Sequence, residues 1–456
     1  MKGFSKHNVF FVGIGGIGMS ALARWFNAKG FAVIGYDKTT TDLTQALFEE
    51  GIMVHYQDSP ALIPEGFTKE NTLVIFTPAI PESHSQLNYF VDNGYEIKKR
   101  AEVLGLISST MFTVAVAGTH GKTTTSSMIA HILKDSGVDT TAFLGGIATN
   151  YNSNLLLGDT DKSIAVIEAD EYDRSFLQLS PDIEIITSVD PDHLDIYGDE
   201  SGMLDSYKLF YGRLQTDGKC LISAKAQETL RLKNIETYGI HGHITASNLR
   251  IEEGRYKFDY VNGTHKIEDI RLNLPGEHNT ENAIAAIAVA TTLGVGDAEI
   301  KHAFETFKGI KRRFEYILEL PEFTFIDDYA HHPAEVAAFL KTLKALYPEQ
   351  FIQVIFQPHL FTRTRDFAEE FAASLSIADS VILMDIYPAR ELPIEGVTAE
   401  IILDKVALEN KNIMTRAEIL AMLENQRPDI LATIGAGNID ALVPEIKELI
   451  TNTITA

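Results

Sequence analysis

The sequence predicts an α/β protein of several domains, each built around a largely parallel sheet. Three observations predict this fold class. The chain has 456 residues, too many for one hydrophobic core. Short apolar strands alternate with segments of helical periodicity along its whole length. Two of the strands run into glycine-rich turns, at residues 13–18 and 118–121, and a helix follows each turn.

Composition and charge limit the classes of function. Hydrophobic residues make up 45% and charged residues 22% of the chain, as in ordinary globular proteins. The formal net charge of -24 argues against a general nucleic-acid or membrane-surface binder, since its mean field repels polyanions. Cys220 is the single cysteine, so the chain can form no internal disulfide. We see no signal peptide and no apolar run long enough to span a membrane, and expect a cytoplasmic protein.

The second glycine turn has the sequence pattern of a phosphate-binding loop. An apolar, β-branched run at residues 112–117 predicts a buried strand, and residues 126–133 have helical spacing. Backbone N–H groups of such a loop and the following helix N-terminus bind anions. Lys122 can reach the outer phosphates and the Thr123 hydroxyl can bind Mg²⁺. Val116 stands where the first glycine of the full pattern belongs, yet we predict a P-loop ATPase-like central domain.

The first glycine turn predicts a Rossmann-like N-terminal domain. A strand at residues 8–12 precedes a full G-x-G-x-x-G, and a second strand at 31–36 ends at an acidic residue. The pattern alone favours NAD, although any diphosphate could bind there. A later strand at 72–76 ends in another loop at the same sheet edge. The candidate binding residues are Gly13, Ile14, Gly15, Gly16, Ile17, Gly18, Asp37, Thr77, Pro78 and Ala79.

Acidic clusters follow two strands of the central domain. The strand at 165–167 runs into Glu168, and the strand at 183–189 runs into a loop that contains His193. In a parallel sheet both strand ends lie beside the Lys122 loop, so Glu168 and His193 are candidate metal ligands next to Thr123. Residues 250–270 predict a β-hairpin. A helix at 281–292 presents Asn282 near its N-terminus.

The last third of the chain predicts another Rossmann-like α/β domain. Strands at 323–326, 351–356, 380–385 and 430–437 alternate with helical segments, and His, Arg and Asp gather at their ends. Paired histidines at 331 and 332 do not predict zinc, because no third ligand has suitable spacing. We expect domain boundaries at 1–108, 109–308 and 309–456, with residues 105–110 as the first crossover.

Taken together, these motifs resemble the Mur ligase family, and most closely its alanine-adding branch. The resemblance rests on residues 12–19, 117–125, 168–171, 191–195, 274–279, 312–314, 327–333 and 356–359. It implies that the first domain holds the UDP of a sugar substrate instead of NAD. It also implies Mg²⁺-assisted, ATP-driven amide formation between L-alanine and UDP-N-acetylmuramate through an acyl phosphate, as part of peptidoglycan synthesis.

The resemblance also implies roles for individual residues. Catalytic candidates are Lys122, Glu168, His193 and His359. Candidates for ATP are Gly118, Thr119, His120, Gly121, Lys122, Thr123, Thr124, Asn282, Arg313 and Asp328. Candidates for the amino acid are Tyr329, His331, His359 and Arg363, and those for metal are Thr123, Glu168 and His193. The family usually has Arg where this chain has Leu360. We expect domain closure to assemble the site, and a monomer or weak homodimer.

Three alternatives remain at this point. A second branch of the same family joins a murein tripeptide to the same nucleotide sugar. A nicotinamide-dependent oxidoreductase would use residues 13–18 but would leave Gly-Lys-Thr at 121–123 without a role. A nucleotide-binding regulatory protein would not need carboxylates and histidines at separate strand ends.

Overall fold

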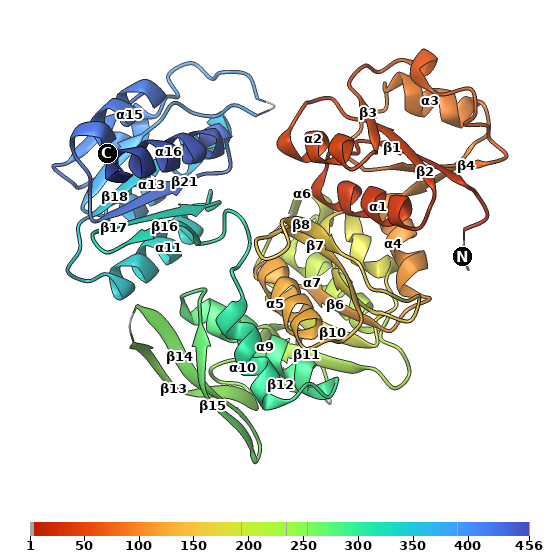
Figure 1. Ribbon diagram of the computed structural model, residues 1–456, viewed down its shortest axis with the longest axis horizontal. Helices are drawn as coiled ribbons and strands as arrows, with labels where there is room; N and C mark the ends of the chain where they lie inside the picture. Colours follow the sequence, from red (N-terminus) through yellow and green to blue (C-terminus); the bar gives the residue numbers. More distant parts are fainter. Residues whose placement is uncertain (1–3, 193, 234, 253, 390, 456) are drawn as a thin grey trace. The chain divides into compact units, whose positions relative to one another are not determined.

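The computed structural model describes residues 4–192, 194–233, 235–252, 254–389 and 391–455. The chain forms two compact units. The first comprises Met1–Arg250, Lys257–Asn273 and Glu277–Phe307, and the second comprises Ile251–Tyr256, Leu274–Gly276 and Lys308–Ala456. Strands form three sheets, of five, ten and six strands, which confirms the predicted α/β class (Figure 1).

The first sheet is parallel throughout, with strand order β3-β2-β1-β4-β5. Its strands are β1 (Asn8–Val12), β2 (Ala32–Tyr36), β3 (Met53–His55), β4 (Thr72–Phe76) and β5 (Glu96–Lys99). Val12 pairs in register with both Tyr36 and Phe76. The loops that follow β1, β2 and β4 therefore begin at one edge of the sheet, where open parallel sheets bind ligands.

Helices cover this sheet and connect its strands. They are α1 (Ile17–Ala28), α2 (Asp42–Glu49), η1 (Pro60–Leu62), α3 (Ser85–Asp92) and α4 (Arg100–Ser108). The prediction that residues 105–110 form the crossover is wrong for most of that segment, because α4 continues to Ser108. Position 105 inside this helix requires glycine, because a Cβ there would lie only 2.5 Å from the Gln178 carbonyl oxygen.

The second sheet has β6 (Thr113–Ala117) between β10 (Ile183–Ile186) and β9 (Ile164–Glu168), all parallel. Its other strands are β7 (Thr140–Ala148), β8 (Ser153–Leu156), β11 (Lys219–Ser223), β12 (Glu236–Tyr238), β13 (Ile244–Glu252), β14 (Arg255–Asn262) and β15 (His265–Leu272). The predicted hairpin corresponds to β14 and β15, which turn at Gly263 with φ +59°. Strand β10 is shorter than predicted, because residues 187–188 leave the sheet to bond the glycine loop after β6.

Helix α5 (Lys122–Asp135) follows that loop and packs beside α9 (Glu277–Thr292) and β7 (Figure 1). Its middle turns, residues 125–133, are buried. Helix α9 begins one turn earlier than predicted. The remaining helices are η2 (Tyr172–Gln178), α6 (Leu194–Tyr197), α7 (Glu200–Tyr211), α8 (Ala224–Leu230) and α10 (Asp297–Thr306).

A buried polar network ties α1 to β8. The Arg24 Nε and Nη2 atoms donate to the Glu50 carboxylate at 2.7 Å, and its Nη1 donates to the Asn154 side-chain oxygen. Asn154 is fully buried, and its amide donates to Ser20 Oγ at 2.9 Å and to the Ile17 carbonyl. Trp25 on the same helix packs against Phe143 of β7. The first and second sheets are therefore joined by both polar and apolar contacts.

The second unit contains the third sheet, with order β16-β17-β21-β18-β19-β20. Its strands are β16 (Glu315–Leu320), β17 (Phe323–Asp328), β18 (Ile352–Phe356), β19 (Ser380–Leu383), β20 (Lys411–Ile413) and β21 (Ile430–Ile434). All neighbours are parallel except the edge strand β16, so the predicted parallel strands are confirmed.

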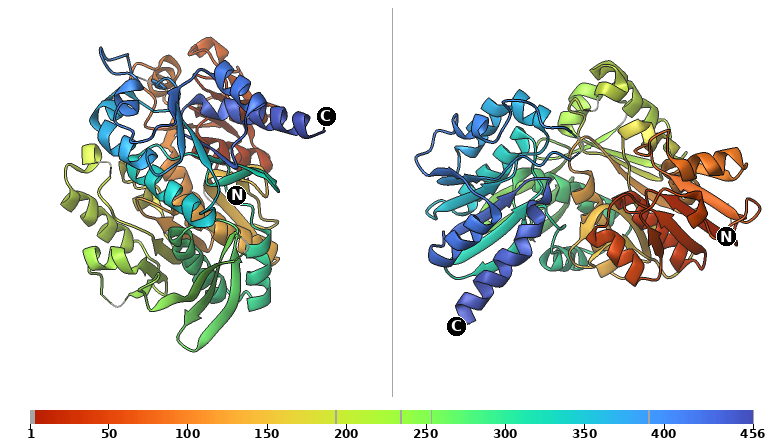
Figure 2. Two further views of the ribbon diagram at one scale, coloured as in Figure 1. Left: turned by 90° about the vertical axis from the view of Figure 1, so that its left-hand side faces the viewer. Right: turned by 90° about the horizontal axis from the view of Figure 1, so that it is seen from above.

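Helices flank this third sheet. They are α11 (Pro333–Leu346), α12 (Phe361–Asp366), α13 (Ala368–Leu375), α14 (Glu400–Leu403), α15 (Arg416–Asn425), η3 (Asn438–Ala441) and α16 (Leu442–Thr455). Helix α16 packs against α15, and its last turns extend past the sheet (Figure 2).

Candidate functional site

Two glycines give the loop after β6 its shape. Gly118 has φ +137° and Gly121 has φ +83°, conformations that L side chains rarely adopt. A Cβ on Gly118 would overlap Thr187 Oγ1, and one on Gly121 would lie 2.7 Å from Asn282 Oδ1. Glycine is therefore needed at both positions for conformation and for space.

Hydroxyl groups at the end of β10 hold the same loop. Ser188 Oγ accepts from the His120 backbone N–H at 2.7 Å and lies 2.9 Å from Thr119 Oγ1. The Thr119 N–H donates to the Ser188 carbonyl at 3.1 Å, and the Thr187 hydroxyl bonds the His120 carbonyl. The loop is thus fixed to the neighbouring strand, as a preorganised phosphate cradle requires.

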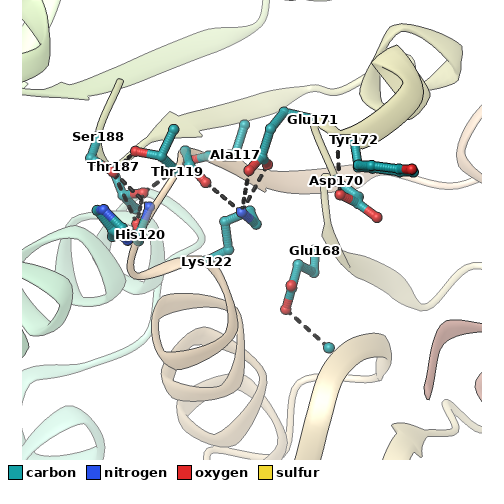
Figure 3. A network of polar contacts seen from close by, with 12 residues as sticks. Ala117, Thr119, His120, Lys122, Glu168, Asp170, Glu171, Tyr172, Thr187 and Ser188 are labelled. Atoms are coloured by element: carbon teal, nitrogen blue, oxygen red, sulfur yellow. Dashed lines mark hydrogen bonds and ion pairs between the residues drawn. The ribbon is translucent and has the colours of Figure 1, made fainter. Parts of the chain in front are cut away.

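Lys122, the first residue of α5, makes two contacts across the loop (Figure 3). Its ammonium donates to the Gly118 carbonyl at 2.6 Å and lies 2.8 Å from the carboxylate of Glu171. Glu171 is 1% exposed. Burial raises the pKa of this carboxyl group, while the ammonium of Lys122 opposes that shift. The lysine predicted to bind phosphate is therefore held at the loop by a buried acidic partner.

Glu168 is the last residue of β9. It lies at the same edge of the second sheet as this loop, because it pairs in register with Val116 of the parallel strand β6. Its carboxylate accepts from the Gly145 N–H at 3.0 Å and is directed away from the Lys122 ammonium (Figure 3). His193, the other predicted metal ligand, lies outside the described residues. Within the described ranges, no three His, Cys, Asp or Glu side chains converge as a metal site.

Asn282 reaches the loop from α9. It is 7% exposed, its Oδ1 accepts from the Thr125 hydroxyl at 3.0 Å, and its amide donates to Asn279 at 3.2 Å. Together with the close approach to Gly121, these bonds place Asn282 beside the first turn of α5. The prediction that this asparagine belongs to the same site as Lys122 agrees with the geometry of the first unit.

The first glycine loop is closed by an acid from the next strand. Asp37 Oδ2 accepts from the Gly15 N–H at 2.7 Å, and its Oδ1 accepts from the Thr39 N–H at 3.2 Å. Gly13 has φ +87°, and a Cβ on it would lie 3.0 Å from Thr77 Cγ2. The structure therefore brings together the three predicted binding segments, which begin at residues 13, 37 and 77.

The amino-acid candidates gather at strand ends of the second unit. The His331 ring lies 5.2 Å from the Tyr329 ring and 6.2 Å from the His359 ring. Burial lowers the pKa of His331 despite the opposing carboxylate of Glu335, and the nearby Arg363 guanidinium lowers it further. Arg363 Nη1 is buried with no hydrogen-bond partner among the described residues. A buried guanidinium nitrogen near His331, whose pKa is lowered, suits a small carboxylate.

Arg313 and Asp328 lie in the same unit. The Arg313 guanidinium lies 5.6 Å from the centre of the Tyr329 ring. Asp328 accepts from the backbone N–H groups of Phe314 at 2.7 Å and Ala330 at 2.8 Å. Burial raises the pKa of Asp328 to about 6, although Arg313 opposes the shift. Leu360 stands at the position where the resemblance leads us to expect Arg. It precedes the first residue of α12, has φ +70°, and its N–H donates to the Tyr387 carbonyl.

The sequence predictions did not assign three residues that contact these loops. Glu171 had a signal, since it belongs to the acidic run after β9, but nothing in the sequence pairs it with Lys122. Ser188 stood at a strand end without a distinguishing pattern. Arg100 begins α4, a helix that no sequence pattern predicted, and donates to Asp170 at 2.8 Å.

Comparison with protein families agrees with this arrangement. Three models match consecutive parts of the chain: the Mur ligase family catalytic domain over residues 8–111, the Mur ligase middle domain over 116–290, and the glutamate ligase domain of Mur ligases over 312–437. The chain belongs to the Mur ligase family. This membership contradicts the alternative that the chain is a nicotinamide-dependent oxidoreductase.

Curated Mur ligases are similar to the chain over nearly its full length. A UDP-N-acetylmuramate–L-alanine ligase of Flavobacterium psychrophilum is 50% identical over 97% of this chain and 98% of its own. The protein of the same name from Cytophaga hutchinsonii is 47% identical over 97% of each chain.

Solved Mur ligase structures share the fold. UDP-N-acetylmuramate-alanine ligase from Thermotoga maritima aligns with a TM-score of 0.83 at 28% identity, covering 98% of this chain and 99% of its own. A murein peptide ligase from Psychrobacter arcticus aligns over the same shares with a TM-score of 0.68 at 22% identity, and supports the fold alone. Across the described residues of this Mur ligase, no helix has the length and apolarity to cross a membrane.

Proposed function

We propose that this Mur ligase joins L-alanine to the lactyl carboxylate of UDP-N-acetylmuramate, with ATP converted to ADP and phosphate, in peptidoglycan precursor synthesis. The observation that carries the proposal is the preformed Lys122 loop in a chain that is 50% identical, over 97% of its length, to a ligase of that name. The reaction uses ATP and a nucleotide sugar, so we assign it to the cytoplasm. A monomer or weak homodimer stays our prediction for the oligomeric state.

The first step brings two anions together. The sugar carboxylate oxygen attacks the γ-phosphorus of ATP, the bond to the β-phosphate oxygen breaks, and an acyl phosphate and ADP result. Lys122 supplies positive charge at the phosphates, and residues 118–124 with Asn282 position the nucleotide. Arg313 and Asp328 are further candidates for nucleotide contacts, and residues 13–18, Asp37 and 77–79 are the candidates for the UDP-sugar.

The second step forms the amide. The amino group of L-alanine attacks the acyl carbon, and inorganic phosphate leaves from the tetrahedral intermediate. We assign the amino acid to Tyr329, His331, His359 and Arg363. The buried Arg363 Nη1 supports a contact with the alanine carboxylate, and the lowered pKa of His331 makes this ring neutral near pH 7.

Mg²⁺ fits the oxygen donors on the central domain. The Thr123 hydroxyl and Glu168 carboxylate are hard ligands of the kind that Mg²⁺ prefers, and His193 is the third candidate. Bound Mg²⁺ would neutralise charge on the phosphates.

The test is a product assay with purified protein, ATP and UDP-N-acetylmuramate. The acceptors are L-alanine, glycine, L-serine and the murein tripeptide, and the readouts are phosphate release and product mass. We expect the highest kcat/KM with L-alanine, although one small group separates it from glycine or serine, worth about 1–3 kcal/mol. Turnover with the tripeptide alone would assign the chain to the other branch.

A further inference from the structure

Arg100 connects the first glycine loop to the acidic loop of the central domain. It is the first residue of α4, directly after β5. Its Nη2 donates to Asp170 Oδ2 at 2.8 Å, and its side chain is 23% exposed. A small cavity lined by Arg100, Glu168 and Asp170 lies at this joint. The guanidinium is therefore held in place by an acid two residues beyond Glu168.

The other side of this guanidinium lies against Gly18. A Cβ on Gly18 would overlap Arg100 Nη1 and lie 3.1 Å from its Cζ. Gly18 is the second residue of α1, so the guanidinium sits at the first turn of the helix that follows the glycine loop. In dinucleotide-binding folds the third glycine of this motif serves close packing of helix on strand. Here it makes room for an arginine from another helix.

The first glycine loop has no basic side chain of its own to bind a phosphate, so a cation there must come from another element. Residues 13–23 contain no Lys or Arg. Arg24, the next basic residue, is engaged by Glu50 and Asn154. The helix N-terminus supplies only partial positive charge, about half an elementary charge, whereas a nucleotide diphosphate carries more than one negative charge.

We propose that Arg100 is an anion-binding residue for the nucleotide sugar, oriented by Asp170 and admitted by Gly18. The proposal rests on the proposed function, since it names a contact to that same substrate. An arginine fork binds phosphate or carboxylate oxygens through two parallel hydrogen bonds, and both groups are present in UDP-N-acetylmuramate.

The first experiment compares Arg100→Ala and Arg100→Lys with Lys99→Ala. Lys99 is the matched control, because it is the neighbouring cation and pairs with Asp173 at 2.9 Å across the same joint. For Arg100→Ala we expect KM for UDP-N-acetylmuramate to rise about 10-fold or more while KM for ATP stays within about twofold. Arg100→Lys should recover part of the loss, and Lys99→Ala should behave as wild type.

Titration calorimetry with UDP and with UDP-N-acetylmuramate identifies the bound group. Weaker binding of UDP itself to Arg100→Ala assigns the contact to the diphosphate. Unchanged UDP binding with weaker binding of the nucleotide sugar assigns it to the carboxylate end. Unchanged affinity for both ligands overturns the proposal. Inactive wild-type protein would instead contradict the proposed function, so the two failures are distinguishable.

The second experiment is a double-mutant cycle with Gly18→Ala. If Gly18 serves to admit Arg100, Gly18→Ala displaces the guanidinium and raises the same KM about as much as Arg100→Ala does. Adding Gly18→Ala to Arg100→Ala should then cost little more. Additive losses would show that Gly18 contacts the substrate or shapes the loop by itself, and would overturn this part of the proposal. Circular dichroism and thermal unfolding establish that each variant is folded.

Discussion

The two glycine loops of the first unit follow the same plan of strand, turn and helix but obtain their charge differently. The loop after β6 has its own cation, Lys122, which is held by the buried Glu171. The loop after β1 has no basic residue within residues 13–23, and its N–H at Gly15 is bound by the acid Asp37. The same backbone plan is thus surrounded by different charges: a lysine held by a buried acid at one loop, and an acid from the next strand at the other.

The largest effect is expected for Lys122→Ala, which removes the cation of the second loop. Amide synthesis should fall by at least about a thousandfold, because in the proposed reaction this ammonium stabilises the charge that develops on the transferring phosphoryl group. Lys134→Ala, at the opposite end of the same helix, is the matched control. Product assays that found amide synthesis intact in Lys122→Ala would contradict the mechanism.

The next largest effect is expected on the pH dependence of the free energy of unfolding, and it comes from a strand beside the second loop. Strands β2 and β4, which flank β1, contain no Asp or Glu, whereas β10 beside β6 contains Glu184. Glu184 is fully buried, and neither carboxyl oxygen has a hydrogen-bond partner among the described residues. Burial raises its pKa from 4.5 to about 8.

Between these two pKa values the folded protein keeps a proton that the unfolded chain has lost. The free energy of unfolding should therefore fall as pH rises from about 4.5 to 8, by on the order of 3 kcal/mol at pH 7. Urea unfolding of Glu184→Gln should lack this slope, while the exposed Glu228→Gln should retain it. Parallel pH profiles for wild type and Glu184→Gln would show that Glu184 is ionised in the folded protein.

A smaller effect is expected for Gly121→Ala in the second loop. Backbone strain and the overlap with Asn282 should weaken nucleotide binding about 10-fold. Gly137→Ala is the matched control, because Gly137 follows the other end of α5 with φ +80° and a Cβ there would meet no atom within 4 Å. ATP titration of both variants measures the effect: Gly137→Ala should bind ATP like wild type, and an unchanged affinity in Gly121→Ala would contradict the prediction.

The smallest effect is expected for Asp37→Asn in the first loop. The amide can still accept from the Gly15 N–H, so the loop keeps its shape and loses a negative charge. We expect KM for the nucleotide sugar to change by a few-fold and KM for ATP to stay constant. Asp92→Asn, an exposed change in the same part of the chain, is the control. An equal shift in both KM values would show that the two loops are coupled through this acid.

Local patterns predicted the strands and the two loops well. Strands β1 and β4 have the predicted bounds, because apolar β-branched runs followed by glycine or proline are strong local signals. Helix α4 escaped prediction, since it begins within the charged run at residues 98–100 and contains Gly105. Its glycine is explained by the approach of Gln178, a contact between residues distant in the sequence.

In the candidate site too, local motifs could be predicted, whereas contacts between residues distant in the sequence could not. Lys122 and Gly121 were predictable because their motif is local. Lys122 and Glu171 are 49 positions apart in the sequence, and Gly18 and Arg100 are 82 positions apart, so neither contact could be predicted from a local motif. The sequence placed Asn282 near a helix N-terminus, but only the family resemblance assigned it to the nucleotide site. Sequence patterns therefore identify the loops, and tertiary contacts decide which charges surround them.

The Arg24–Asn154 network has a further consequence for substrate choice. Because it fastens α1 to β8, both strand–loop–helix segments belong to one compact unit that buried hydrogen bonds hold together. We therefore expect the two glycine loops to keep a fixed separation. A nucleotide sugar bound at the first loop must then have its carboxylate at one particular distance to meet a nucleotide bound at the second. Analogues with a spacer lengthened by even one bond should be rejected, although every chemical group they carry is correct.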